Sequence, residues 1–287
     1  MSTGSATSAD ARAKFTELVA PQTVDPSLGE IALWIAAEEY PGLNVEEYLG
    51  RLDRLAERVE RVGRRLDEGP VQALRIVLAE EQGFHGNRDA YYDARNSFLN
   101  DVLDGRAGIP ITLSILYLEV ARRMGLEAAG VSFPGHFLLR IEHEQESLIL
   151  DPFHGGATLS LDDCAGLFAR ATGNQIPFHR RFLQPSDWRE IVLRMLTNLK
   201  GIYLADPVDL PRALAAVDRM LLVRPDALSQ VRDRGLLLYR MEDYERAAVD
   251  LERVVGADED ERAGSINPEQ LETLRRLLDN LSDLMGK

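Results

Sequence analysis

The sequence predicts an α+β domain followed by an all-helical repeat. Two observations support this prediction, a change of periodicity and a repeated pattern. From Gly125 to about residue 153 the apolar residues form short runs rich in Val, Ile, Leu and Phe, as in strands, whereas the flanking segments have helical periodicity. In the last third of the chain, a helical pattern recurs after 34 residues, the tetratricopeptide period. Because helices precede the strands instead of alternating with them, we expect an α+β rather than a βαβ arrangement.

The composition and the net charge indicate which kinds of partner and which cellular location to expect. The 287 residues are 45% hydrophobic and carry a formal net charge of −14, which argues against a nucleic acid or an anionic membrane as partner. The most apolar stretch, residues 109–120, is interrupted by Glu119 and is too short to span a bilayer. The start of the chain is small and polar, without the apolar core of a secretory signal. We therefore expect a mobile tail over residues 1–27 and a cytoplasmic protein.

The segment before the strands is expected to be helical. The pattern that begins at Leu28 stops at Pro41-Gly42, and Asn44 suits the N-cap of a second helix that runs to about Leu66. A third helix is expected over residues 70–81. Residues 83–97 mix glycine, aromatic and polar residues without a period, which predicts an ordered loop.

A buried helix and three strands are expected next. Pro110 suits the first position of a helix, because its missing N–H would have no partner there. Residues 111–124 are apolar on nearly all sides, so this helix is expected to be central. Strands are predicted within residues 129–133, 136–143 and 147–153, the last two as an antiparallel hairpin. A further helix, residues 159–173, completes a domain expected over residues 28–187.

The remaining residues, 188–287, are expected to form the helical repeats. Positions separated by 34 residues match in size and polarity: Gly201, Leu204, Ala213, Val217 and Met220 correspond to Gly235, Leu238, Ala247, Leu251 and Val254. Small residues at such positions let antiparallel helices approach closely. A last helix, with Asn267 as its N-cap, is expected to close the stack. Repeats of this kind predict a protein or peptide partner.

Two residues of the expected hairpin suggest a catalytic arrangement. His136 begins one strand and Asp151 ends the next, so the hairpin can bring their side chains within hydrogen-bonding reach. An aspartate that holds a histidine in one tautomer is the orienting half of a nucleophilic triad. The third member would stand at the start of the buried helix, where the helix dipole lowers the pKa of a thiol.

Three motifs carry a resemblance to a known family. They are "FHGNRDAYYDARNSFLNDVLDGRAGIPITLSILYLEVARRMGL", "GVSFPGHFLLR" and "LILDPFHGG". With them the chain resembles the transglutaminase-like proteins of the SirB group, in which such a domain precedes tetratricopeptide repeats. The resemblance covers roughly residues 28–255. It implies a papain/transglutaminase-like fold and a Cys-His-Asp order, with the cysteine opening the central helix.

The chain departs from that pattern at the nucleophile. His136 and Asp151 fall on the His and the Asp of the motif, but the helix opens with Pro-Ile-Thr-Leu-Ser at residues 110–114 and contains no cysteine. The single cysteine, Cys164, comes after both residues, which is the wrong order. It also follows two aspartates, whose charges would raise the pKa of a thiol. We therefore expect Cys164 to be a buried structural residue.

Several interpretations of this site stay open. Thr112 or Ser114 can replace the thiol if His136 activates the hydroxyl, but such hydroxyls also bond back to a carbonyl one turn earlier. The pair of His136 and Asp151 can equally be structural. A zinc site would need a set such as His85, His136, Asp151 and His154, and the sequence offers no close ligand spacing for it. We expect neither a metal nor a cofactor.

The segment before the central helix adds residues that are expected to line a cleft: His85, Asn87, Arg88, Tyr91 and Pro110. The same loop can instead pack on the core through its tyrosines. With the nucleophile missing, the function expected is that of a degenerate transglutaminase-like protein that binds partners as an adaptor. The alternative is an amide hydrolase or acyl-transferase that uses Thr112 or Ser114 with His136 and Asp151.

Overall fold

The computed structural model describes residues 7–286 and divides into two compact units, with the boundary between Met195 and Leu196. The first unit is α+β and the second is all-helical, as expected. The expected boundary at residue 187 lies somewhat too early. Trp188, Ile191 and Val192 are buried, and the side chain of Ile191 packs against Gly130 of the sheet. These residues begin helix α8 (Trp188–Leu204), so the beginning of α8 belongs to the first unit.

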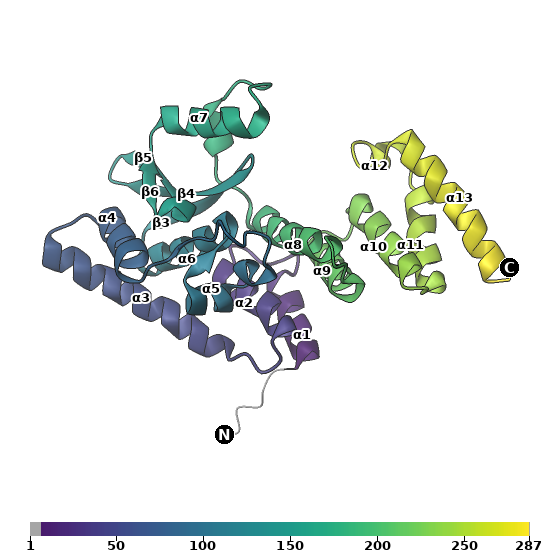
Figure 1. Ribbon diagram of the computed structural model, residues 1–287, viewed down its shortest axis with the longest axis horizontal. Helices are drawn as coiled ribbons and strands as arrows, with labels where there is room; N and C mark the ends of the chain where they lie inside the picture. Colours follow the sequence, from purple (N-terminus) through teal and green to yellow (C-terminus); the bar gives the residue numbers. More distant parts are fainter. Residues whose placement is uncertain (1–6, 287) are drawn as a thin grey trace. The chain divides into compact units, whose positions relative to one another are not determined.

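Between residue 7 and the start of α8, the structure has seven α-helices: α1 (Ser8–Leu18), α2 (Leu28–Glu39), α3 (Val45–Leu66), α4 (Pro70–Arg75), α5 (Leu99–Gly105), α6 (Pro110–Arg123) and α7 (Leu161–Thr172) (Figure 1). Shorter turns link them: the π-helix η1 (Ile76–Glu81) and the 3-10 helices η2 (Ala94–Ser97), η3 (Pro152–His154) and η4 (Arg180–Leu183). Asn44 caps α3 as expected, since its side chain accepts a hydrogen bond from the Glu47 N–H. The helix expected over residues 70–81 widens into a π-helix at Ile76.

The mobile tail expected over residues 1–27 is wrong for residues 8–18. They form α1, capped by Thr7, and the side chains of Ala11 and Phe15 are fully buried. Helix α1 packs on α2, and the burial of these two side chains compensates for a polar composition. Residues 1–6 lie outside the described part of the chain.

The sheet has four antiparallel strands in the order β3 (Glu127–Phe133), β4 (His136–His143), β5 (Glu146–Asp151) and β6 (Ala157–Leu159). This arrangement confirms the predicted hairpin of β4 and β5. A separate parallel pair consists of β1 (His85–Gly86) and β2 (Ala107–Gly108). This pair joins the loop around His85 to the start of α6. Each of its strands has two residues, and no pattern in the sequence predicts them.

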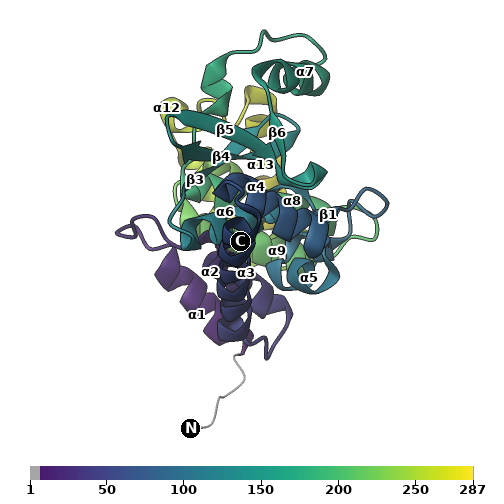
Figure 2. The same ribbon diagram turned by 90° about the vertical axis from the view of Figure 1, so that its left-hand side faces the viewer.

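Helix α6 forms the centre of the first unit. It lies between the sheet and the helices α2, α3 and α5, and its residues from Pro110 to Ala121 are all buried (Figure 1). On the other face of the sheet, α7 covers a second apolar cluster that contains Phe133, Leu138 and Cys164 (Figure 2). Because both faces are covered, β4 is apolar along most of its length.

The second unit is built from helix pairs. Its elements are the end of α8 (Trp188–Leu204), α9 (Leu210–Val223), α10 (Leu228–Arg240), α11 (Tyr244–Gly256), α12 (Glu259–Arg262) and α13 (Pro268–Leu284). Helix α10 packs on α9 and α11, and α11 packs on α13. A Cβ atom at Gly235 would lie 2.7 Å from the Leu251 side chain, so the expected close approach is confirmed there. A Cβ atom added at Gly201 would meet no atom of another described element within 4 Å, so the helices make no such approach there.

Candidate functional site

The hairpin of β4 and β5 brings His136 and Asp151 into contact. The Nε2 atom of His136 lies 2.8 Å from Oδ2 of Asp151. The imidazole is 11% exposed and the carboxylate 2%, so the pair is largely shielded from water. With Nε2 bound to the aspartate, Nδ1 is the ring nitrogen left to face a reacting group, as a nucleophilic triad would require.

The carboxylate of Asp151 is hydrogen bonded to several groups at once. Its Oδ2 also lies 2.7 Å from Nδ1 of His154, and its Oδ1 accepts the backbone N–H of His154 at 3.2 Å, which caps η3. Burial alone would raise the pKa of the Asp151 carboxyl, but the hydrogen bonds and charges of His136 and then His154 lower it below its usual value. The residue is therefore ionised at neutral pH, with two imidazoles directed at one oxygen.

Aromatic contacts fix the two imidazoles. The Phe153 ring meets His136 edge to face at 5.9 Å and His154 at 5.2 Å between ring centroids. Phe153 is itself held against Gly86, where an added Cβ would lie 2.5 Å from the ring. The Tyr91 ring packs on the same phenylalanine at 6.2 Å. These contacts restrict how far either imidazole can turn.

Arg194, at the first-unit end of α8, holds the turn from which His136 emerges. Its guanidinium donates to the carbonyl oxygens of Phe133 and His136, the latter at 2.6 Å, and to the hydroxyl of Ser132 at 2.7 Å. Burial lowers the pKa of Arg194, and the nearby Tyr91 opposes this effect. Arg194 thus positions the backbone of His136 without contacting its ring.

The start of α6 supplies no hydroxyl to His136. The Oγ of Ser114 donates to the carbonyl of Phe137 at 3.2 Å. The Oγ1 of Thr112 is buried and has no hydrogen-bond partner within residues 7–286. Neither hydroxyl bonds back to a carbonyl one turn earlier in its own helix, so that interpretation is wrong for both. Pro110 occupies the first position of the helix, as predicted.

Cys164 is buried, as expected. It stands on α7, within the apolar cluster that this helix forms with the sheet, and is fully inaccessible. Burial raises the pKa of its thiol, and the charges of Asp163 and Asp151 raise it further. A protonated, inaccessible thiol is a poor nucleophile.

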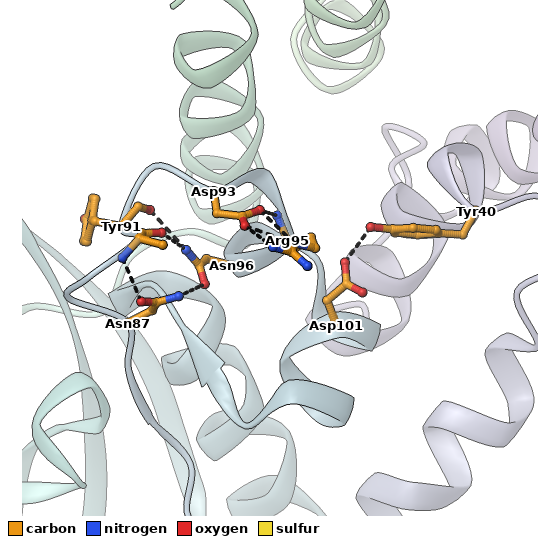
Figure 3. Close-up of polar contacts among 8 residues, drawn as sticks. Tyr40, Asn87, Tyr91, Asp93, Arg95, Asn96 and Asp101 are labelled. Atoms are coloured by element: carbon orange, nitrogen blue, oxygen red, sulfur yellow. Dashed lines mark hydrogen bonds and ion pairs between the residues drawn. The ribbon is translucent and has the colours of Figure 1, made fainter.

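A network of amides shapes the loop before α6 (Figure 3). Asn87 donates to the side chain of Asn96 at 2.9 Å and accepts the N–H of Ala90 at 3.0 Å. Asn96, nearly buried, donates in turn to the carbonyls of Ala90 and Tyr91. The backbone carbonyl of Asn96 accepts the Ile109 N–H, which joins the loop to the entrance of α6.

The residues expected to line a cleft are brought together only in part. Tyr91 reaches the histidines through Phe153. His85 is exposed, with its Nδ1 atom 2.8 Å from the Gly83 carbonyl oxygen, and Arg88 is exposed as well. Asn87 lines a separate hollow of about 430 Å³, together with Asp93, Arg95, Asn96, Asp101, Asp104, Gly105 and Ala107. Among these lining residues, Asp101 accepts a hydrogen bond from Tyr40 at 2.6 Å and Asp93 pairs with Arg95 (Figure 3).

Sequence reasoning missed the roles of three residues. From the sequence, His154 is expected only as one of the ligands that a zinc site would need, Arg194 lies far along the chain, and Phe153 is an ordinary apolar residue. A signal existed for His154, since it follows Asp151 by three residues and one helical turn brings such positions together. No pattern in the sequence predicts the contact of Arg194 with the turn before His136, or the packing of Phe153 against the histidines.

Comparisons with known proteins support the fold of both units. The first unit is a transglutaminase-like domain, since a model of the transglutaminase-like superfamily matches residues 46–197. A tetratricopeptide repeat model matches residues 199–279. The UPF0162 protein of Xylella fastidiosa is 36% identical over 227 residues, which is 77% of this chain and 80% of the relative. That of Pseudomonas aeruginosa is 32% identical, over 82% of this chain and 86% of the relative.

The chain therefore belongs to the UPF0162 family of transglutaminase-like proteins, and the predicted resemblance, a transglutaminase-like core followed by tetratricopeptide repeats, is confirmed. F-box only protein 21 of Mus musculus is 38% identical over 108 residues, 35% of this chain and 17% of that protein. No solved structure matches the chain. None of the helices within residues 7–286 has the length and apolar character that a membrane crossing requires.

Proposed function

We propose that this chain is a nucleophile-lacking transglutaminase-like protein that acts as a binding or adaptor module, with a protein or peptide partner held by its cleft and helical repeats. The observation that carries the proposal is the start of α6. Where the family resemblance implies a cysteine, the chain has Pro110 to Ser114, and neither hydroxyl there is hydrogen bonded to His136. An imidazole oriented by aspartate but without a nucleophile performs no acyl transfer.

A groove in the second unit supports the binding role. It has a volume of about 440 Å³ and is lined by Lys200, Leu204, Asp233, Leu236, Leu237, Tyr239, Arg240 and Leu277. Most of this lining is apolar, while Lys200 and Asp233 pair at 2.8 Å. Apolar grooves with a few fixed charges suit a peptide segment. The net charge of −14 favours a protein or peptide over a nucleic acid, and we propose a cytoplasmic location.

The alternative is an amide hydrolase or acyl-transferase that uses Thr112 or Ser114. It requires a hydroxyl whose proton His136 can take, and the hydrogen bonding at the start of α6 gives it less support.

The binding proposal is tested by affinity capture with the full-length chain and two matched variants. Leu204 lines the groove and is 37% exposed, whereas Val249 is 65% exposed on α11 and lies outside the groove lining. Both side chains are partly open to solvent, so the carboxylate of a glutamate at either position can reach water. We expect Leu204→Glu to deplete captured partners at least tenfold, as quantified by mass spectrometry, and Val249→Glu to retain them. Equal capture by Leu204→Glu and the unchanged protein would contradict binding in this groove.

A further inference from the structure

Three metal-ligating atoms converge beside the start of β4. His136 Nε2, Asp151 Oδ2 and His154 Nδ1 all lie within 4.8 Å of one another. Both imidazoles direct a ring nitrogen at the same carboxylate oxygen, at 2.8 and 2.7 Å. A structural pair or a catalytic dyad needs a single histidine on the aspartate. The second histidine therefore calls for an explanation of its own.

We propose that His136, Asp151 and His154 form a binding site for a divalent transition metal ion, with zinc as the ion that fits best. Two imidazoles and one carboxylate are a donor set that zinc accepts in proteins, and three protein ligands leave a position open for water or a bound group. The ion takes the place of the protons that join the two rings to Asp151. A ring nitrogen binds a metal through its lone pair, so each neutral imidazole then carries its proton on the other ring nitrogen. This inference concerns the first unit and goes beyond partner binding through the repeats.

The distances fit an ion after a small adjustment. With bonds of about 2.0–2.1 Å, the ligands of a tetrahedral zinc ion lie roughly 3.3 Å apart. The two nitrogen–oxygen separations, 2.8 and 2.7 Å, are shorter than this value, and the two ring nitrogens lie within 4.8 Å of each other, so both rings must shift slightly to admit an ion. His154 has the most room to do so, because its side chain is 42% exposed and stands on the short helix η3. That exposure also gives an ion a path from solvent.

The surroundings hold the ligands as a metal site requires. Ligands need neighbours that fix their orientation. The second oxygen of Asp151 accepts the backbone N–H of His154, so the carboxylate has only one oxygen to offer to an ion. The ring of Phe153 packs on both imidazoles, and Arg194 fixes the backbone carbonyl of His136. The site is thus oriented before any ion enters.

Calorimetric titration of the chelator-treated full chain with ZnCl₂ tests the proposal, and Co²⁺ absorption spectra report the ligand geometry. We expect one ion per chain, and an affinity at least tenfold weaker in His154→Ala and in His136→Ala. His143→Ala and His179→Ala are the controls, because these histidines lie outside the cluster. Both should bind as the unchanged protein does.

His154→Ala decides the question if His136→Ala folds poorly, since the His154 ring is half-exposed and its loss leaves the sheet intact. Circular dichroism of each variant checks folding. Absence of saturable zinc binding overturns the proposal, as does unchanged affinity in His154→Ala, or an equal loss in the two control variants.

Discussion

Replacing Asp151 by alanine is expected to lower the free energy of unfolding by about 3 kcal/mol, because the change leaves two imidazole N–H donors without their acceptor and removes the cap of η3. The carboxylate is nearly inaccessible and binds His136 and His154 through a single oxygen. Asp151→Asn keeps the shape and one acceptor, so a smaller loss, on the order of 1–3 kcal/mol, is expected for it.

Urea unfolding in the presence of a chelator measures this effect without a contribution from bound ions. Asp89→Ala is the matched control, because Asp89 is an exposed aspartate in the loop before α5, and it should change stability by less than about 0.5 kcal/mol. Asp151→Ala protein as stable as the Asp89→Ala control would show that the carboxylate does not brace the hairpin.

Gly156→Ala is expected to cost about 3 kcal/mol, from backbone strain and a steric clash together. Gly156 has a φ of +71°, and an added Cβ would lie 2.8 Å from Cε1 of Tyr117, a fully buried ring in α6. The ring cannot move away without disturbing the centre of the first unit. The loop that carries His154 would shift instead.

Gly155 provides an unusually close control. Its φ is +72°, and the nearest atom to an added Cβ is Cβ of Ala79 at 3.7 Å, an ordinary contact. Gly155→Ala should therefore show the strain alone, about 1 kcal/mol. The difference between the two variants in urea unfolding isolates the clash. Equal losses at the two positions would mean that the Tyr117 ring gives way freely.

Much of the fold followed from local patterns. The N-cap at Asn44, the buried helix that begins at Pro110 and the hairpin of β4 and β5 all rest on signals that tertiary contacts reinforce. The prediction was wrong for residues 8–18, which form a helix although their composition is polar. Two buried side chains, Ala11 and Phe15, stabilise this helix. It was also displaced at the domain boundary, because a helix that runs across two units shows no break in its sequence.

The part of the candidate site that depends only on strand pairing could be predicted from the sequence. His136 and Asp151 stand at ends of adjacent strands, so their contact followed from pairing alone. The third group, His154, depended on the 3-10 turn after Asp151, which turns its ring back toward the same oxygen. The direction of the Ser114 hydroxyl depended on how α6 meets the Phe137 carbonyl. Such choices are made by packing between elements and leave no periodic signal.

The most direct test of a binding role without catalysis is to measure hydrolysis by the chelator-treated full chain. The substrates are a glutamine amide peptide and an activated ester. The missing nucleophile predicts turnover no higher than that of His136→Ala, because neither hydroxyl at the start of α6 is hydrogen bonded to the imidazole. Turnover by the unchanged protein that disappears in His136→Ala and in Ser114→Ala or Thr112→Ala, with each variant still folded, would contradict a binding role without catalysis.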